Sequence, residues 1–163
     1  MRIGNLQIVP FDPEHLRQLT PRSFEGTEME LLGDYVERSR QYLKLGPAYT
    51  GIIDGQIMMC AGVFPLWRGV AETWLVTTPL VPQYPVCFHR AISRMLAILE
   101  KGMDLWRIQT ALHWRHKVSH KWVKRLGFRW EGEMPGYGPD GETYIRFGRV
   151  RKKVEGGDNP CHS

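Results

Sequence analysis

Two histidines have the spacing that proton-transfer chemistry can use. His116 and His120 lie four residues apart in HKVSHKWVKRL, so on a helix they could face the same side. Imidazole titrates near neutral pH and can act as a general acid or base. The spacing also suits a metal pair, but no third ligand is evident, and we therefore predict no metal site. The alternative is a pair of surface histidines on a basic helix.

The segment around these histidines is strongly basic. It contains no Asp or Glu between Leu105 and Trp130, and its cations are Arg107, Arg115, Lys117, Lys121, Lys124, Arg125 and Arg129. Such a run can bind a phosphate-rich ligand or a nucleic-acid backbone, or it can be a solvated helix face. Trp114, Trp122 and Trp130 interleave with the cations, as in proteins that bind single strands. Because they fall on different predicted elements, we do not expect nucleic acid as a partner.

Length and composition predict one globular domain at residues 1–151 and a polar tail at residues 152–163. Apolar residues make up 42% of the chain and charged residues 24%, with a net charge of +5, which favours anionic partners weakly. No apolar run approaches the roughly 20 residues that span a bilayer, so we expect no membrane partner. Cys60, Cys87 and Cys161 show no metal-binding spacing, and we expect free thiols in a cytoplasmic protein.

The pattern of apolar residues and turn signals predicts an alternation of strands and helices. We expect strands at residues 6–11, 48–53, 56–67, 71–78, 106–114, 128–134 and 143–150. Helices are expected at residues 12–19, 27–45, 86–101 and 117–126, the second of them opening with a capping box at Thr27–Glu30. Asp54-Gly55 predicts a tight hairpin, and Gly127 predicts a left-handed helix end. This order predicts an α/β (α+β) domain with a mixed sheet and helices on both faces.

The element order, ending in HKVSHKWVKRLGFRWEGE, resembles the GNAT family of acyl-CoA-dependent N-acyltransferases. The last helix of that family often ends in a basic residue shortly before Leu-Gly-Phe, and an acidic turn follows. The matching residues here are Lys124, Arg125, Leu126, Gly127, Phe128, Glu131 and Glu133. The overall cadence also resembles compact GNAT-like proteins of tailed phages, some of them virion-associated. The resemblance implies a mostly antiparallel GNAT-like sheet.

The resemblance implies acetyl-CoA as the cofactor. Its pantetheine arm would lie in a gap between two splayed strands, near Leu75, Val76 and Thr77. Its pyrophosphate would lie at the start of the next helix, near Phe88, His89 and Arg90. The glycine-rich loop of the family is missing here, because its glycine positions align with Phe88 and Arg90. Phe88 would crowd the phosphate and Arg90 could bind it, or Phe88 packs in the core and Arg90 faces water.

The resemblance also assigns roles in catalysis. The family tyrosine that protonates the leaving thiolate aligns with Val123, which cannot transfer a proton, so His116 or His120 would have to replace it. Glu72, at the start of ETWLVTT, is the best-placed general base, or else an ordinary charge at a strand edge. Trp74, Tyr137 and Tyr144 could line an acceptor pocket, or they only pack.

Two functions remain open on the sequence. The first is an acetyl-CoA-dependent N-acyltransferase that acts on an unidentified amine, either a small molecule or a protein. The second is a catalytically degenerate GNAT-like scaffold that makes protein contacts as a homodimer or in a phage assembly, for example a virion-associated or accessory protein. A cofactor cleft requires a V-shaped gap between the strands at Val76 and Ile108, and side chains such as Phe88 must not fill it.

Overall fold

The computed structural model describes residues 1–22 and 34–151. The predicted capping box at Thr27–Glu30, the polar tail at residues 152–163 and Cys161 lie outside the described residues. The second predicted helix is described from its N-cap Asp34, whose side chain accepts a hydrogen bond of 3.0 Å from the backbone N–H of Glu37. Its predicted end at Gly46-Pro47 is confirmed, because Gly46 is the C-cap.

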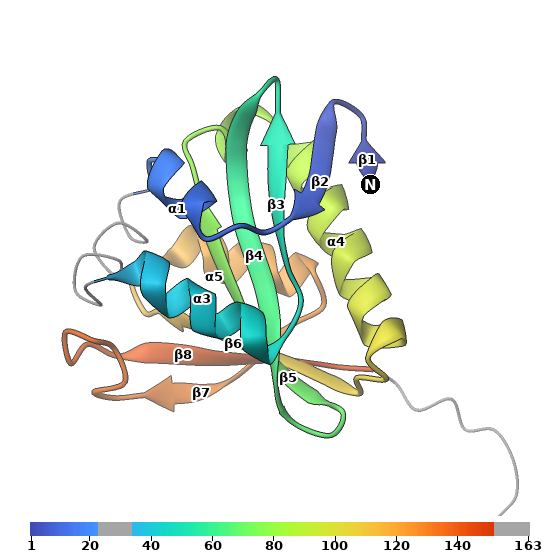
Figure 1. The fold of residues 1–163 in the computed structure, drawn as a ribbon. Coiled ribbons are helices and arrows are strands. Elements are labelled where there is room, and N and C mark those ends of the chain that lie inside the picture. Colours follow the sequence, from blue (N-terminus) through green and yellow to red (C-terminus); the bar gives the residue numbers. More distant parts are fainter. Residues whose placement is uncertain (23–33, 152–163) are drawn as a thin grey trace, which may run out of the picture.

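An eight-stranded sheet forms the centre of the molecule (Figure 1). Its strands run in the order β1-β2-β3-β4-β5-β6-β8-β7, and every neighbouring pair is antiparallel except β5 and β6. Their bounds are Arg2–Ile3 for β1, Leu6–Pro10 for β2, Ala48–Ile53 for β3, Gln56–Trp67 for β4, Val70–Thr77 for β5, Arg107–His113 for β6, Arg129–Met134 for β7 and Tyr144–Val150 for β8. The predicted mixed, mostly antiparallel sheet is confirmed. β1 was not predicted, since two residues carry no periodicity.

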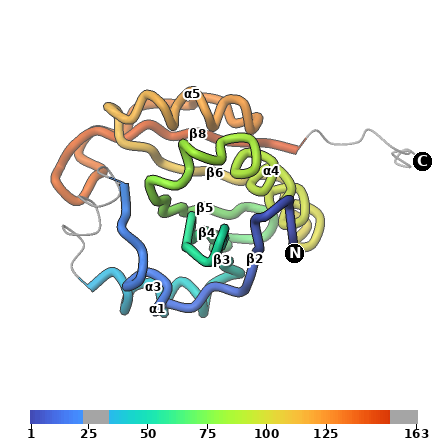
Figure 2. The backbone as a smooth tube through the Cα atoms, turned by 90° about the horizontal axis from the view of Figure 1, so that it is seen from above, coloured from blue at the N-terminus to red at the C-terminus, as the bar shows by residue number. Residues whose placement is uncertain are grey.

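Helices cover both faces of this sheet, as predicted (Figure 2). α1 (Glu14–Gln18) and α3 (Tyr35–Leu45) lie on the front face in Figure 1, and α4 (Pro85–Gly102) and α5 (Lys117–Arg125) lie behind it. A short 3-10 helix, Val81–Gln83, interrupts the proline-rich segment before α4. No helix among the described residues is long and apolar enough to cross a bilayer.

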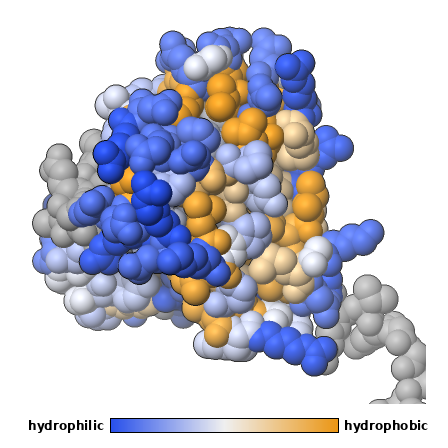
Figure 3. Space-filling model, viewed as in Figure 1, coloured by the Kyte–Doolittle hydropathy of each residue, from blue (hydrophilic) through white to orange (hydrophobic). Residues whose placement is uncertain are grey.

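The spacing of apolar residues explains how the helices pack. α4 buries Phe88, Ala91, Ile92, Met95, Leu96 and Leu99, which recur every three or four residues and therefore share one face. They join the main core between the sheet and the two rear helices. The outer surface over α1 and α3 is hydrophilic, as the space-filling view shows (Figure 3). The sheet is thus packed from both sides.

Tight turns occur where the sequence predicts them. Asp54 and Gly55 have φ angles of 49° and 75°, as a type I′ hairpin between β3 and β4 requires. The corner after α5 is a Schellman motif, because Phe128 N–H bonds Val123 O at 3.1 Å and Gly127 N–H bonds Lys124 O at 3.0 Å. Gly127 has a φ of 86°, and Phe128 is buried in the main core. The helix therefore ends abruptly and β7 enters the sheet at once.

Two of the three cysteines lie within the described residues, and both are free thiols. Cys60 is fully buried, and this burial raises the pKa of its thiol to about 11. Cys87 is half-buried, and its thiol donates a hydrogen bond to the Ile3 carbonyl at 3.1 Å. Cys60 is therefore a packing residue rather than a nucleophile.

Substitution of Gly127 tests whether the corner depends on backbone conformation. A Cβ at this position would meet only Arg149 Nη1, at 3.6 Å, so Gly127→Ala adds no severe clash and imposes only the left-handed backbone on alanine. We expect a loss of about 1 kcal/mol in the free energy of unfolding, measured by urea denaturation. Gly132→Ala in β7 is the control, because Gly132 has open space around it and no positive φ. Equal effects of the two substitutions on the free energy of unfolding would contradict a dependence of the corner on the left-handed conformation of Gly127.

Candidate functional site

The parallel strands β5 and β6 pair over only three residues each and then separate. The pairs are Val70 with Arg107, Ala71 with Ile108 and Glu72 with Gln109. β5 nevertheless continues to Thr77, and β6 continues to His113. The predicted V-shaped gap is therefore present. It opens beyond Glu72 rather than at Ile108, which is fully buried and paired with Ala71.

The backbone of β5 points into this gap at alternate residues. Thr110 Oγ1 on β6 donates a hydrogen bond of 3.4 Å to the Thr73 carbonyl, so that carbonyl points toward β6. Backbone groups two residues apart along a strand point the same way. The N–H and C=O of Leu75 therefore also face the gap, beyond the last ladder pair of the described strands.

A cavity of about 320 Å³ occupies the gap. Its walls come from both faces of the sheet, because residues of α3 line it as well as residues of α4 and α5. Towards the front the lining includes Tyr35, Tyr42, Phe64, Glu72, Trp74, His113, Tyr137 and Tyr144. Towards the back it includes Leu75, Ile92, Leu96, Thr110, His116, Ser119, Trp122 and Val123. A ligand in the cavity could thus be contacted by side chains from either face of the sheet.

Glu72 is the carboxylate of this cavity, and two side chains hold it. Gln109 Nε2 donates a hydrogen bond of 3.2 Å to Glu72 Oε2, and Arg146 Nη1 lies 3.1 Å from Glu72 Oε1. The Arg146 contact lacks hydrogen-bond geometry and is therefore an electrostatic pairing. Both side chains are largely buried, 16% exposed for Glu72 and 19% for Arg146. The guanidinium of Arg146 also lies 5.7 Å from the Tyr137 ring centroid.

A second ion pair orients Gln109 from the other side. Arg107 binds Glu131 through two hydrogen bonds of 2.7 and 2.5 Å and donates from Nε to Gln109 Oε1 at 3.1 Å. The pair lies over Gly148 of β8, where a Cβ would come within 2.2 Å of Glu131 Oε1. Arg107 holds the pKa of the Glu131 carboxyl below its usual value. We call Glu72, Arg107, Gln109, Glu131 and Arg146 the polar network.

The start of α5 forms the opposite wall, and it separates the two histidines predicted as proton donors. His116 is the N-cap residue of α5 and lines the cavity, with its Nε2 3.2 Å from Ser119 Oγ. His120 Nε2 instead lies 3.0 Å from the His113 carbonyl oxygen, and its ring packs on Phe147. Burial lowers the pKa of His120. Of the two, His116 is the one that the structure brings to the cavity.

The α5 residue aligned with the family tyrosine contributes only packing. Val123 is 4% exposed and belongs to the main core. Within residues 1–22 and 34–151, no group of three or more His, Cys, Asp and Glu side chains is arranged to hold a metal ion. His116 and Ser119 are therefore the side chains at this wall that could exchange protons. Ser119 was not among the residues predicted for the site.

The predicted cofactor residues are distributed between the cavity and the core. Leu75 lines the cavity, whereas the side chains of Val76 and Thr77 are buried elsewhere, at 2% and 3% exposure. Phe88 is 4% exposed and stacks on Trp122 at a centroid distance of 4.9 Å. It packs in the core and is not part of the cavity lining. The predicted crowding by Phe88 is therefore not observed at the gap.

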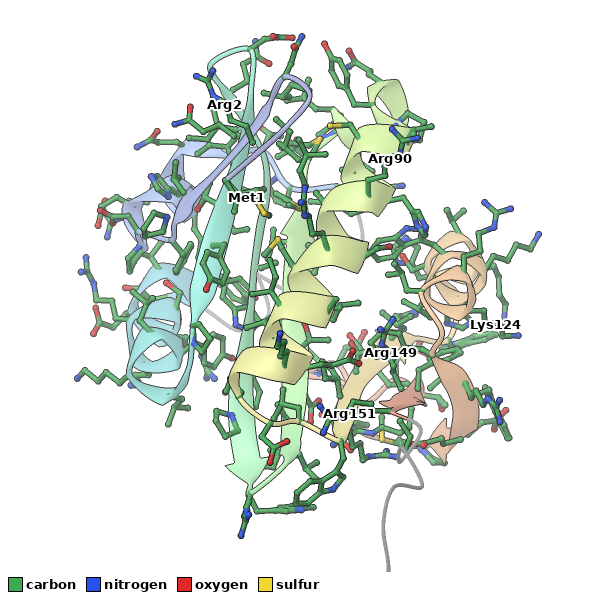
Figure 4. All side chains as sticks on the ribbon, turned by 90° about the vertical axis from the view of Figure 1, so that its right-hand side faces the viewer. Met1, Arg2, Arg90, Lys124, Arg149 and Arg151 are labelled. Atoms are coloured by element: carbon green, nitrogen blue, oxygen red, sulfur yellow. The ribbon has the colours of Figure 1, made fainter. Side chains whose placement is uncertain are left out.

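The start of α4 leaves backbone donors available. Pro85, the first residue of the helix, has no N–H, and the first helical hydrogen bond runs from Phe88 N–H to the Tyr84 carbonyl at 3.0 Å. Val86 and Cys87 therefore carry N–H groups without an intrahelical acceptor. His89 is half-buried, and Arg90 is exposed and projects outward from α4 (Figure 4). These groups suit an anion at the helix start.

Comparison with known proteins identifies the fold. No family profile matches the sequence, and no curated protein matches it. Among solved structures, a ribosomal-protein-S5-alanine acetyltransferase from Vibrio fischeri is similar over 96% of this chain and 98% of its own, with a TM-score of 0.67 and 15% identity. A GNAT family acetyltransferase from Elizabethkingia anophelis, with acetyl-CoA bound, is similar over 91% and 99%, with the same TM-score and identity.

A spermidine N-acetyltransferase chimera based on the Vibrio cholerae enzyme gives a third comparison. The structural match covers 90% of this chain and 96% of the chimera's chain, with a TM-score of 0.67 and 13% sequence identity. The structural similarity establishes the fold, and sequence identities this low leave the activity open. The chain has the GNAT fold over nearly its whole length, and the resemblance found in the sequence is confirmed at this level.

Substitution of Glu131 tests the electrostatic part of the polar network. Because the pKa of Glu131 is lowered in the folded state, its stabilisation is present above the unfolded pKa and is lost as the pH falls through the folded pKa. We expect Glu131→Gln to lower the free energy of unfolding by about 1 kcal/mol at pH 7, by urea denaturation, and to have a progressively smaller effect as the pH falls through the lowered pKa. Exposed Glu133→Gln is the control. A loss of stability that does not change with pH would argue against the ion pair.

Proposed function

We propose that the protein is an acetyl-CoA-dependent N-acetyltransferase that acts on an amine. The observation that carries this proposal is the cavity between β5 and β6, with a carboxylate, Glu72, among its front residues and the His116–Ser119 pair among its rear ones. A GNAT fold without such an opening would give no reason to expect turnover. Here the opening lies at the divergence of the two central strands.

The residues present fit the cofactor that the fold family implies. Acetyl-CoA supplies an acetyl group activated as a thioester. The Leu75 N–H and C=O face the gap and can hydrogen-bond the amide groups of an extended pantetheine arm. The N–H groups of Val86 and Cys87, with Arg90 beside them, can hold a pyrophosphate without a glycine-rich loop.

Glu72 is the proposed general base. Its ion pair with Arg146 and the hydrogen bond from Gln109 fix its orientation toward the cavity. A bound amine arrives mainly as an ammonium ion, and Glu72 takes its proton directly or through a water molecule. The nitrogen lone pair then becomes available for attack. The contribution of Glu72 depends on close placement of the amine.

His116 and Ser119 are the proposed source of the returning proton. The Ser119 hydroxyl delivers a proton to the leaving group, and His116 Nε2 replaces it across their 3.2 Å contact. Both residues lie at the start of α5, where unpaired N–H groups favour negative charge. This arrangement supplies the acid that Val123 cannot supply. The alternative of a scaffold without activity has only Val123 and the missing glycines in its favour.

Isothermal titration with CoA and acetyl-CoA tests the proposal directly. We expect saturable binding of one ligand per chain, and we expect Arg90→Gln to weaken it several-fold through loss of a charge-assisted phosphate contact. Arg17→Gln on α1, at the other face of the sheet, is the matched control and leaves the affinity unchanged. Absence of binding at millimolar ligand would falsify the proposed function.

Measurements of turnover test the proposed roles of Glu72 and Ser119 in proton transfer. With an amine that the wild type acetylates, we expect Glu72→Gln and Ser119→Ala each to lower kcat/KM by about 100-fold or more, since each removes a proton-transfer group. Both variants keep their affinity for CoA, and Glu133→Gln is the control. Wild-type activity of Glu72→Gln would assign this carboxylate a structural role only.

A further inference from the structure

The front half of the cavity is walled by aromatic rings. Tyr42 of α3 and Phe64 of β4 stack at a centroid distance of 5.6 Å with 20° between their planes, and Trp74 of β5 lies 5.9 Å from Tyr42. Tyr137 and Tyr144 pack together at 5.6 Å and line the same cavity near the β7–β8 connection. Glu72 lines the cavity with them. Aromatic faces thus enclose a space next to the proposed base.

Three of these rings lie outside the core of the protein. Among the described residues, Tyr42, Phe64 and Tyr137 belong to neither of the two hydrophobic core clusters, whereas Trp74 packs against one of them and Tyr144 is 6% exposed. Tyr42 and Phe64 are half-buried, and Tyr137 is 49% exposed. An aromatic side chain that adds little to the core but lines a cavity is well placed to contact a ligand. Their arrangement is therefore informative about the acceptor.

The charges around the cavity limit what the acceptor can be. Of the described residues that line it, Glu72 is the only Asp or Glu, and none is Lys or Arg. Arg146 already offsets the charge of Glu72, at 3.1 Å. A polyamine would bring further ammonium groups into a cavity whose described lining residues offer no second carboxylate, and burying an unpaired charge is costly. A single amine on an uncharged body brings one ammonium group, which Glu72 faces, and so meets a smaller penalty.

We propose that the acceptor is a primary monoamine with an aromatic ring, an arylalkylamine, whose ring lies among Tyr42, Phe64 and Tyr137 and whose nitrogen faces Glu72. This inference rests on the proposed function, since it names the substrate class of the same site. Offset or edge contacts with the ring walls supply affinity, and the short alkyl linker brings the amine to the carboxylate. The chemistry remains acetyl transfer to nitrogen, with the amine proton passing to Glu72.

Binding and turnover of three amines test the inference. The probes are 2-phenylethylamine, hexylamine of similar reach without a ring, and spermidine, each titrated calorimetrically with and without CoA. We expect phenylethylamine to bind about three- to tenfold more tightly than hexylamine, from ring contacts alone, and more tightly still than spermidine. We expect the same order in kcat/KM with acetyl-CoA. Equal affinities, or preference for spermidine, would overturn the substrate class.

A pair of variants tests whether Phe64 contacts the aromatic ring of the bound amine. Phe64→Leu keeps an apolar side chain but removes one ring, so phenylethylamine affinity should fall about three- to tenfold while hexylamine affinity stays the same. Trp67→Leu, at the 65% exposed end of β4, is the matched control and changes neither. Retained hexylamine binding and an unchanged melting temperature show that Phe64→Leu is folded. No change in phenylethylamine affinity would place the ring elsewhere and overturn the inference.

Failure of this inference is distinct from failure of the proposed function. If CoA binds and spermidine is acetylated faster than phenylethylamine, the substrate class is wrong and the N-acetyltransferase activity stands. If CoA does not bind but phenylethylamine does, the pocket is an amine site and the proposed activity is wrong. If no amine binds with or without CoA, the acceptor site itself is wrong.

Discussion

The early end of the parallel pairing between β5 and β6 is the constraint on which the candidate site depends. β5 stays paired with β4 through Thr77, and β6 stays paired with β8 through His113, so each strand is held on its outer side. Their inner edges separate after Glu72. Backbone polar groups left at such an edge need partners. An extended ligand with amide groups is a suitable partner, and this need links the geometry of the sheet to the choice of cofactor.

The front of this gap is organised by contacts that cross several strands. Glu131 on β7 fixes Arg107 on β6, Arg107 orients Gln109, and Gln109 donates to Glu72 on β5. Arg146 on β8 completes the polar network. Gly148 makes it possible, because any side chain there would displace the ion pair. The position of the proposed base is therefore set by the three strands that follow β5 in the sheet, β6, β8 and β7.

Local signals were enough to predict most of the fold. Asp54-Gly55 at the hairpin and Gly127 at the corner occur where a positive φ restricts residue choice, and Gly46 ends α3 as expected; each prediction is confirmed. Helix α4 was predicted from a stripe of apolar residues that only a period of 3.6 brings to one face. Short elements were predicted less well. β1 was missed, and α1 begins at Glu14, with Pro13 as its cap residue.

The sequence by itself determined the order of elements and the basic character of α5, because periodicity, turn residues and charge are properties of neighbouring residues. The GNAT-like class of fold was implied by the resemblance of this order, and of the Leu126-Gly127-Phe128 corner, to that family. Only the tertiary structure decided which candidates meet. It brings His116 and not His120 to the cavity, turns Phe88 into the core against Trp122, and pairs Glu72 with Arg146. Each of these outcomes depends on the packing of one element against another, sometimes across more than seventy positions of the chain, as between Glu72 and Arg146. No local pattern encodes such a contact.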